Sequence, residues 1–135
     1  KVAEAKGCDF VDINFGCPVP KVVKKGAGSA MMKDLPNVQA MFRAMRAAVQ
    51  LPITIKIRTG WDANQRNALD VCNLAADEGI TWVAIHGRTR AQGYSGLADW
   101  DFIANIQNIA RFTHTIPPHI CGRDRLKVPG SNYFG

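Results

Sequence analysis

The chain has 135 residues, of which 47% are hydrophobic and 21% are charged, a composition typical of a globular domain and not of a disordered tail. No stretch approaches the roughly 18 apolar residues that a membrane span needs, and the first residues lack the apolar segment of a signal peptide. We therefore expect a cytoplasmic protein with no membrane partner. The net charge of +6 favours a polyanionic partner, although charge alone indicates nonspecific attraction rather than a function.

The predicted elements alternate between strand and helix along the chain. Residues 2–7 look like the end of a helix. Three short β-branched runs, which lack the polar alternation of an open antiparallel sheet, predict buried parallel strands over residues 10–15, 53–58 and 82–86. This order predicts an α/β fold with right-handed crossovers, either a doubly wound sheet or a barrel. Three strands cannot close a barrel of roughly 250 residues, so we expect a fragment.

Three helices are predicted between and after these strands. Asp34 and Pro36 open the first, which Leu51 and Pro52 end. Asp62 is expected to open the second, and Gly79 to cap its carboxyl end. The third is predicted from about residue 99 to 111, with four side chains facing inward: Phe102, Ile103, Ile106 and Ile109.

The four cysteines predict neither a zinc site nor a disulfide framework. They stand at positions 8, 17, 72 and 121 without any CxxC pair, and three lie in segments that have a strand-end or helix pattern. We expect reduced thiols and no bound metal. The sequence gives no indication of a protein partner.

Polar residues gather where the three predicted strands end, and the carboxyl ends of parallel strands share one edge of a sheet. They are Asn14 and Cys17, Lys56 and Arg58, and His86 and Arg88. A lysine between isoleucines in a buried strand requires an anionic ligand, an electron-rich ligand or a core carboxylate. His86 by itself is open to three interpretations: a core histidine, a base, or a donor to a bound anion. On one rim, His86, Lys56 and Arg58 together predict an electropositive pocket for phosphate or a reduced, anionic cofactor.

Three motifs in this order resemble the bacterial tRNA-dihydrouridine synthases. They are DINFGCP at residues 12–18, KIRTGW at 56–61, and HGRTR at 86–90 followed by Tyr94, Gly96 and ADW at 98–100. The resemblance covers about residues 5–106. It implies a piece of a (β/α)8 TIM barrel, about three consecutive βα units, that reduces uridine to 5,6-dihydrouridine in tRNA. FMN reduced by NADPH would pass a hydride to C6 of the uracil while an acid protonates C5.

The resemblance also implies roles for individual residues. Cys17 matches the catalytic acid, and a thiol is mostly protonated at neutral pH and able to donate a proton. Lys56 matches the lysine that contacts the flavin ring, and His86 a residue beside the ribityl or phosphate group. Asn14 matches a position that contacts the uracil or the ribityl group, and Arg58 matches one that faces the substrate cavity. The cations expected on the rim that meets tRNA are Lys21, Lys24, Lys25, Arg88 and Arg90.

The end of the chain departs from this pattern. After residue 110 the family would continue with two more strands, each ending in a glycine-containing turn, and the second turn grips the FMN phosphate. The sequence has only a partial match at residues 122–124. We therefore expect a partial flavin domain over 1–110 and a poorly ordered tail over 111–135. The isolated chain is expected to be inactive, because barrel phosphate sites use the last two loops.

Two other functions fit some of these features. One is a flavin barrel that acts on a free pyrimidine, as in a dihydroorotate dehydrogenase. The other is an inactive, basic α/β piece that only binds RNA. The basic loop at residues 21–25 and the HGRTR motif favour an RNA substrate over a free base.

Overall fold

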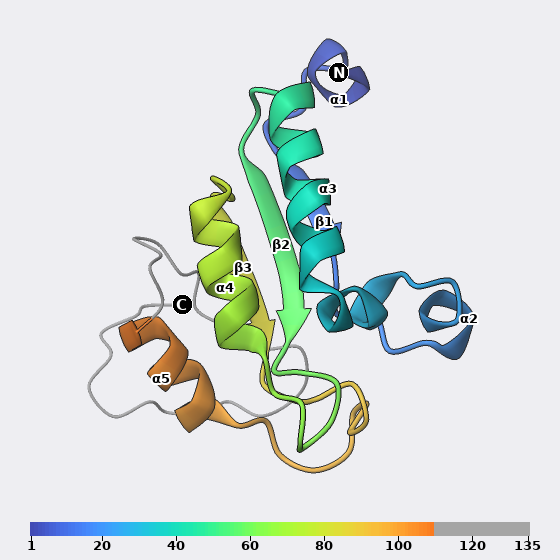
Figure 1. Ribbon diagram of the computed structural model, residues 1–135, viewed down its shortest axis with the longest axis vertical. Helices are drawn as coiled ribbons and strands as arrows, with labels where there is room; N and C mark the ends of the chain where they lie inside the picture. The colour runs from blue at the N-terminus through green and yellow to red at the C-terminus, as the bar shows by residue number, and fades with distance from the viewer. Residues whose placement is uncertain (110–135) are drawn as a thin grey trace.

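Three parallel strands form the centre of the computed structural model, which describes residues 1–109 (Figure 1). The strands lie side by side in the order β1-β2-β3. Their bounds are Val11–Asn14 for β1, Ile53–Arg58 for β2 and Trp82–His86 for β3. The second and third match the expected strands to the residue, and the first is one residue shorter at each end. The predicted α/β class and parallel pairing are confirmed.

Helices precede, connect and follow the strands. They are α1 (Val2–Ala5), α2 (Pro20–Val23), the 3-10 helix η1 (Gly28–Lys33), α3 (Leu35–Ala48), α4 (Ala68–Asp77) and α5 (Trp100–Ile109). Asp34 caps α3 as predicted, because its carboxylate accepts a hydrogen bond from the backbone N–H of Asn37. Gly79 ends α4 with a φ of +73°, a conformation that favours glycine.

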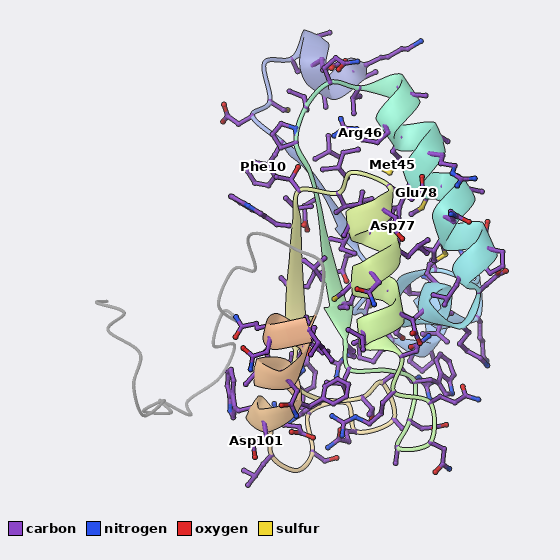
Figure 2. The ribbon with its side chains drawn as sticks, turned by 60° about the vertical axis from the view of Figure 1, so that its left-hand side comes forward. Phe10, Met45, Arg46, Asp77, Glu78 and Asp101 are labelled. Carbon is purple, nitrogen blue, oxygen red and sulfur yellow. The ribbon has the colours of Figure 1, made fainter. Side chains whose placement is uncertain are left out.

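The core lies between the sheet and helices α3 and α4, which cover the same face of the sheet (Figures 1 and 2). Ile53, Ile55 and Ile57 of β2 are fully buried there. They pack with side chains from α3 and α4, chiefly Val38, Phe42, Val71, Cys72 and Ala75. Full burial of a valine, isoleucine or phenylalanine side chain contributes about 1.5–3 kcal/mol. Burial of these side chains therefore holds α3 and α4 against one face of the sheet.

Polar contacts join α3 to α4 at the surface of this layer. The Glu78 carboxylate, labelled in Figure 2, accepts hydrogen bonds from Gln39 Nε2 at 2.6 Å and Arg43 Nε at 3.0 Å. Arg46 donates through Nη2 to the carbonyls of Val49 and Leu51, each at 2.7 Å. These bonds set the start of β2 against the end of α3.

Two expectations about the helices were wrong. Asp62 does not open α4, because its carboxylate instead accepts from the N–H groups of Asn64 and Gln65 and closes a separate turn. The helix begins at Ala68, six residues later. Ile109 is 61% exposed and not inward, because no described residue covers the last turn of α5.

The remaining sequence expectations concern the membrane, metals and the tail. Within residues 1–109 no helix is long and apolar enough to cross a bilayer, and no three metal-ligating side chains cluster. Cys8, Cys17 and Cys72 are free thiols. The predicted tail over 111–135, like Cys121, lies outside the described residues.

Candidate functional site

The uncovered face of the sheet brings together four of the predicted site residues. Strand register places Asn14 beside Lys56 and Arg58 beside His86. Residues in register between parallel strands, and residues two apart in one strand, point to the same face. All four side chains therefore lie on the face opposite the buried isoleucines. The sequence placed them at the strand ends, and the register puts them on one surface.

Lys56 is exposed, which corrects the expectation that it is buried among isoleucines. The two flanking residues, Ile55 and Ile57, are completely buried, whereas Lys56 lies on the opposite, open face. It forms no ion pair with any carboxylate among residues 1–109, so the alternative of a core carboxylate partner finds no support in this part of the chain. Its ammonium group is available to a ligand.

Arg58 ties two loops of the rim together. Its side chain is buried, at 2% exposure. It donates from Nε to the Gly16 carbonyl at 2.7 Å, and from Nη1 to the carbonyls of Thr89 at 3.0 Å and Gly93 at 2.8 Å. Burial is the main cause that lowers the pKa of its guanidinium. The geometry makes Arg58 an anchor between the loop after β1 and the loop after β3, and contact with substrate stays a prediction.

Cys17 is held in place through its backbone, which leaves its thiol free. Its carbonyl accepts hydrogen bonds from Ser29 N at 3.0 Å and Ser29 Oγ at 2.9 Å. Gly28 has a φ of +60°, and a Cβ there would lie 2.7 Å from the Cys17 carbonyl oxygen. Only glycine fits this close approach. The Cys17 side chain itself is partly exposed at the end of β1.

The basic loop after Cys17 is not simply an irregular loop, because it contains α2 and η1. Lys21 and Lys25 are exposed to solvent in this segment, as is Lys24. Arg88 donates from Nε and Nη2 to the Gly96 carbonyl at 3.1 and 2.9 Å. These cations lie on connections that follow β1 and β3, at the end of the sheet where the Cys17 loop (residues 15–19) begins.

His86 is electrically neutral at neutral pH. Burial, followed by the charges of Arg58, Arg88 and Lys56, lowers its pKa to about 4. Its Nδ1 atom is buried without a hydrogen-bond partner among the described residues, and its ring meets Tyr94 edge-on at 6.3 Å between centroids. A buried ring nitrogen without a partner is costly unless a ligand supplies one.

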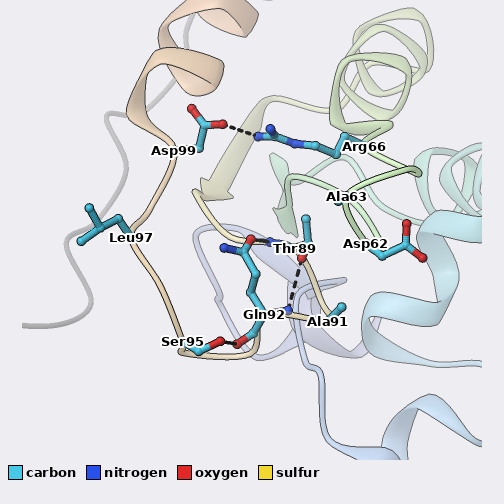
Figure 3. Close-up of a pocket in the computed structure, with 9 residues that line it drawn as sticks. All are labelled: Asp62, Ala63, Arg66, Thr89, Ala91, Gln92, Ser95, Leu97 and Asp99. Carbon is cyan, nitrogen blue, oxygen red and sulfur yellow. Dashed lines mark hydrogen bonds and ion pairs between the residues drawn. The ribbon is translucent and has the colours of Figure 1, made fainter.

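A pocket lies beside the open face of the sheet rather than on it. It has a volume of about 670 Å³ between the loops that follow β2 and β3 (Figure 3). Arg66 and Asp99, which form an ion pair at 2.8 Å across it, line it together with Asp62, Ala63, Thr89, Ala91, Gln92, Ser95 and Leu97. None of these is a predicted catalytic or cofactor residue, and the pocket carries two carboxylates. We do not place the flavin there.

Sequence comparisons identify the family. The sequence model described as dihydrouridine synthase (Dus) matches residues 1–117, which include every residue of the open face and of the Cys17 loop. The chain belongs to the dihydrouridine synthase family. This confirms the resemblance drawn from the three motifs, and the three parallel βα units are part of the TIM barrel of that family.

Several relatives agree with this assignment. A probable tRNA-dihydrouridine synthase of Rickettsia prowazekii is 46% identical over 111 residues, covering 82% of this chain and 34% of that protein. The tRNA-dihydrouridine synthase B of Pseudomonas syringae pv. tomato is 50% identical over 101 residues, covering 75% of this chain and 30% of that protein. The chain spans about a third of the length of the curated dihydrouridine synthases that it matches.

Sequence reasoning missed several residues that organise this dihydrouridine synthase site. Ser29 holds the Cys17 carbonyl, and its only signal was a place in the glycine-rich segment after the basic loop. Asp99 accepts from Phe102 N, pairs with Arg66 and thereby joins α5 to the loop after β2. Arg66 also lies over the Phe102 ring at 3.8 Å. No pattern in the sequence pairs residues so far apart.

The low pKa of His86 is a testable property of the cofactor-free protein. We expect its imidazole to titrate near pH 4 in NMR spectra, with the resonance assigned by its loss in His86→Gln. Because the unfolded state takes up this proton near pH 6.5 and the folded state near pH 4, the contribution of His86 to stability is present above pH 6.5 and lost as pH falls toward 4. Arg88→Gln should raise the pKa of His86. Titration of His86 at or above pH 6.5 would contradict this account.

Proposed function

We propose that the complete dihydrouridine synthase containing this chain reduces uridine to 5,6-dihydrouridine in tRNA, with Cys17 as the proton donor. The observation that carries the proposal is one face that holds the cations Lys56 and Arg58 together with the neutral His86, at the end of the sheet where the Cys17 loop begins. A partly exposed thiol beside a surface suited to a reduced cofactor fits reduction of a base. The cytoplasmic location expected from the sequence agrees with a tRNA substrate.

The open face has the donors that a flavin needs. FMN, reduced by NADPH, would supply the hydride when bound. Lys56 carries a cation without a described carboxylate partner, which suits a negatively charged reduced isoalloxazine ring. His86, neutral and with a buried Nδ1 lacking a partner, suits hydrogen bonding to the ribityl or phosphate group. We infer that these two residues bind the cofactor.

The residues after β1 would act on the uracil. Addition of a hydride at C6 leaves a negative charge on the base, and Cys17 Sγ–H donates its proton to C5, giving the 5,6-dihydro product. The resulting thiolate regains a proton from solvent. The Oδ1 atom of Asn14 accepts a hydrogen bond from the Gly16 N–H at 2.8 Å, so its Nδ2 is left to donate to a uracil carbonyl. Asn14 thus orients the base, and Arg58 holds the Cys17 loop against the loop after β3.

The substrate would approach across the basic rim. Lys21 and Lys25 are exposed and Arg88 and Arg90 are partly exposed, so all four can meet phosphates, and each phosphate contact adds salt-dependent affinity. A uridine stacked within folded RNA has to be turned out of the stack before its C5 and C6 atoms reach Cys17. The face of the sheet that the helices leave open is accessible to a uracil base turned out of the RNA in this way.

The proposed function has a direct test. The purified complete protein is expected to be yellow from bound flavin, to bleach with NADPH, and to recover its colour on addition of unmodified tRNA but not of orotate. Recovery with orotate alone would indicate a free-pyrimidine reductase. A protein that binds tRNA but never binds flavin would indicate an inactive RNA-binding protein. The isolated 135-residue chain, whose residues 1–109 supply three of the eight barrel strands, is expected to remain colourless.

A further inference from the structure

A cluster of two cations around one indole ring lies on the same rim, apart from the proposed catalytic residues. Lys33 Nζ is 4.5 Å from the centroid of the Trp61 ring, and Arg90 Cζ is 4.6 Å from it. The three residues come from η1, from the loop after β2 and from the loop after β3. Three separate connections therefore converge on this ring.

The charges of this cluster are not balanced within residues 1–109. Neither Lys33 nor Arg90 forms an ion pair there, and the carboxylates next in sequence are engaged elsewhere. Asp34 accepts from the N–H of Asn37, and Asp62 accepts from the N–H groups of its own turn. The π-electrons of Trp61 attract both cations and restrict their positions, but the two positive charges still repel each other. An anion bound close to either cation would offset that repulsion.

A pocket adjoins the cluster on the side of Lys33 and Trp61, which both line it, whereas Arg90 does not. Its volume is about 460 Å³, and no carboxylate lines it. The lining residues are Met32, Lys33, Trp61, Asn64, Gln65, Arg66 and Asn67. The larger neighbouring pocket differs, because the Asp62 carboxylate lines it and Asp99 is paired there with Arg66. The smaller pocket combines the unpaired ammonium group of Lys33 with amide side chains, the groups that bind phosphates of nucleic acids.

We propose that Lys33, Trp61 and Arg90 form a seat for a phosphate of the RNA backbone. The inference rests on the proposed function and adds a second contact for the same substrate. Arg90 was already expected on the tRNA rim, whereas Lys33 and Trp61 are assigned from the structure. Lys33 belongs to η1, the element whose Ser29 holds the Cys17 carbonyl. A strand bound at this seat would therefore lie on the rim that carries the Cys17 loop.

The test is the affinity of the complete protein for unmodified tRNA at several salt concentrations. We expect Lys33→Gln to weaken binding by about fivefold or more, and to lower the slope of log Kd against log salt by about 1, as loss of one phosphate contact does. Trp61→Phe keeps an aromatic ring and should bind nearly as the parent does, whereas Trp61→Leu should bind as weakly as Lys33→Gln. Melting temperatures of all variants check that they fold.

Lys6→Gln is the matched control, because it removes the same charge from an exposed residue after α1, at the opposite end of the sheet (Figure 1). Its Kd and salt slope should equal those of the parent protein. If Lys33→Gln also equals the parent while tRNA is bound and reduced, the phosphate seat is wrong and the proposed function stands. If the parent protein neither binds nor reduces tRNA, the proposed function fails and the seat fails with it.

Discussion

Replacing Cys17 with alanine in the complete protein is expected to leave flavin reduction by NADPH intact and to lower tRNA reduction by about 100-fold or more. General acid catalysis contributes roughly 10²- to 10⁴-fold to such a step, and alanine has no proton to give. The change spares the structure of the loop, because Ser29 bonds to the Cys17 carbonyl and not to its thiol. The two half-reactions, followed separately by flavin absorbance, distinguish a lost acid from a lost cofactor.

Two further variants sharpen this result. Cys17→Ser keeps the size of the side chain but replaces the thiol with a much weaker acid, so tRNA reduction should remain far below that of the parent. Cys8→Ala removes an exposed thiol that precedes β1, and it should reduce tRNA at the parental rate. Parental tRNA reduction by Cys17→Ala would show that another group donates the proton.

Replacing Arg58 with methionine is expected to lower the free energy of unfolding by about 3 kcal/mol, because three buried or partly buried carbonyls lose a charged hydrogen-bond donor. Those carbonyls belong to Gly16, Thr89 and Gly93, on two loops that the Arg58 side chain joins. Urea-induced unfolding of the complete protein measures the change. We also expect tRNA reduction to fall, since the Cys17 loop loses one of its attachments.

Two control variants distinguish the effect of the buried Arg58 side chain from the general loss of an arginine. Arg43→Met removes an exposed ion pair to Glu78 and should destabilise the protein much less. Arg58→Lys retains the charge but not the planar group that bonds two loops at once, so it should recover only a small part of the loss. Equal unfolding curves for Arg58→Met and Arg43→Met would refute the anchoring role.

Local sequence patterns predicted most of the fold. Strands β2 and β3, the cap at Asp34 and the glycine after α4 were all predicted correctly, because each depends on residues close together in the chain. The start of α4 was predicted wrongly, because the local sequence does not decide it. Asp62 has the composition of a helix cap, and only the fold shows that its carboxylate closes a separate turn.

The sequence by itself determined the family and the kinds of chemical group in the site. Three motifs in order carry that information, and the β-branched runs that they contain or follow predict that Cys17, Lys56 and His86 gather at strand ends. The family match over residues 1–117 confirms the family level of the prediction.

Only the tertiary structure decided how those groups are arranged. Strand register put Asn14 and Lys56 side by side on the face that the helices leave open. Long-range contacts buried Arg58 as an anchor and gathered Lys33 and Arg90 around Trp61. The physical reason is that register, burial and charge pairing depend on residues distant in the chain, whose separations are set only when the sheet and its helices pack.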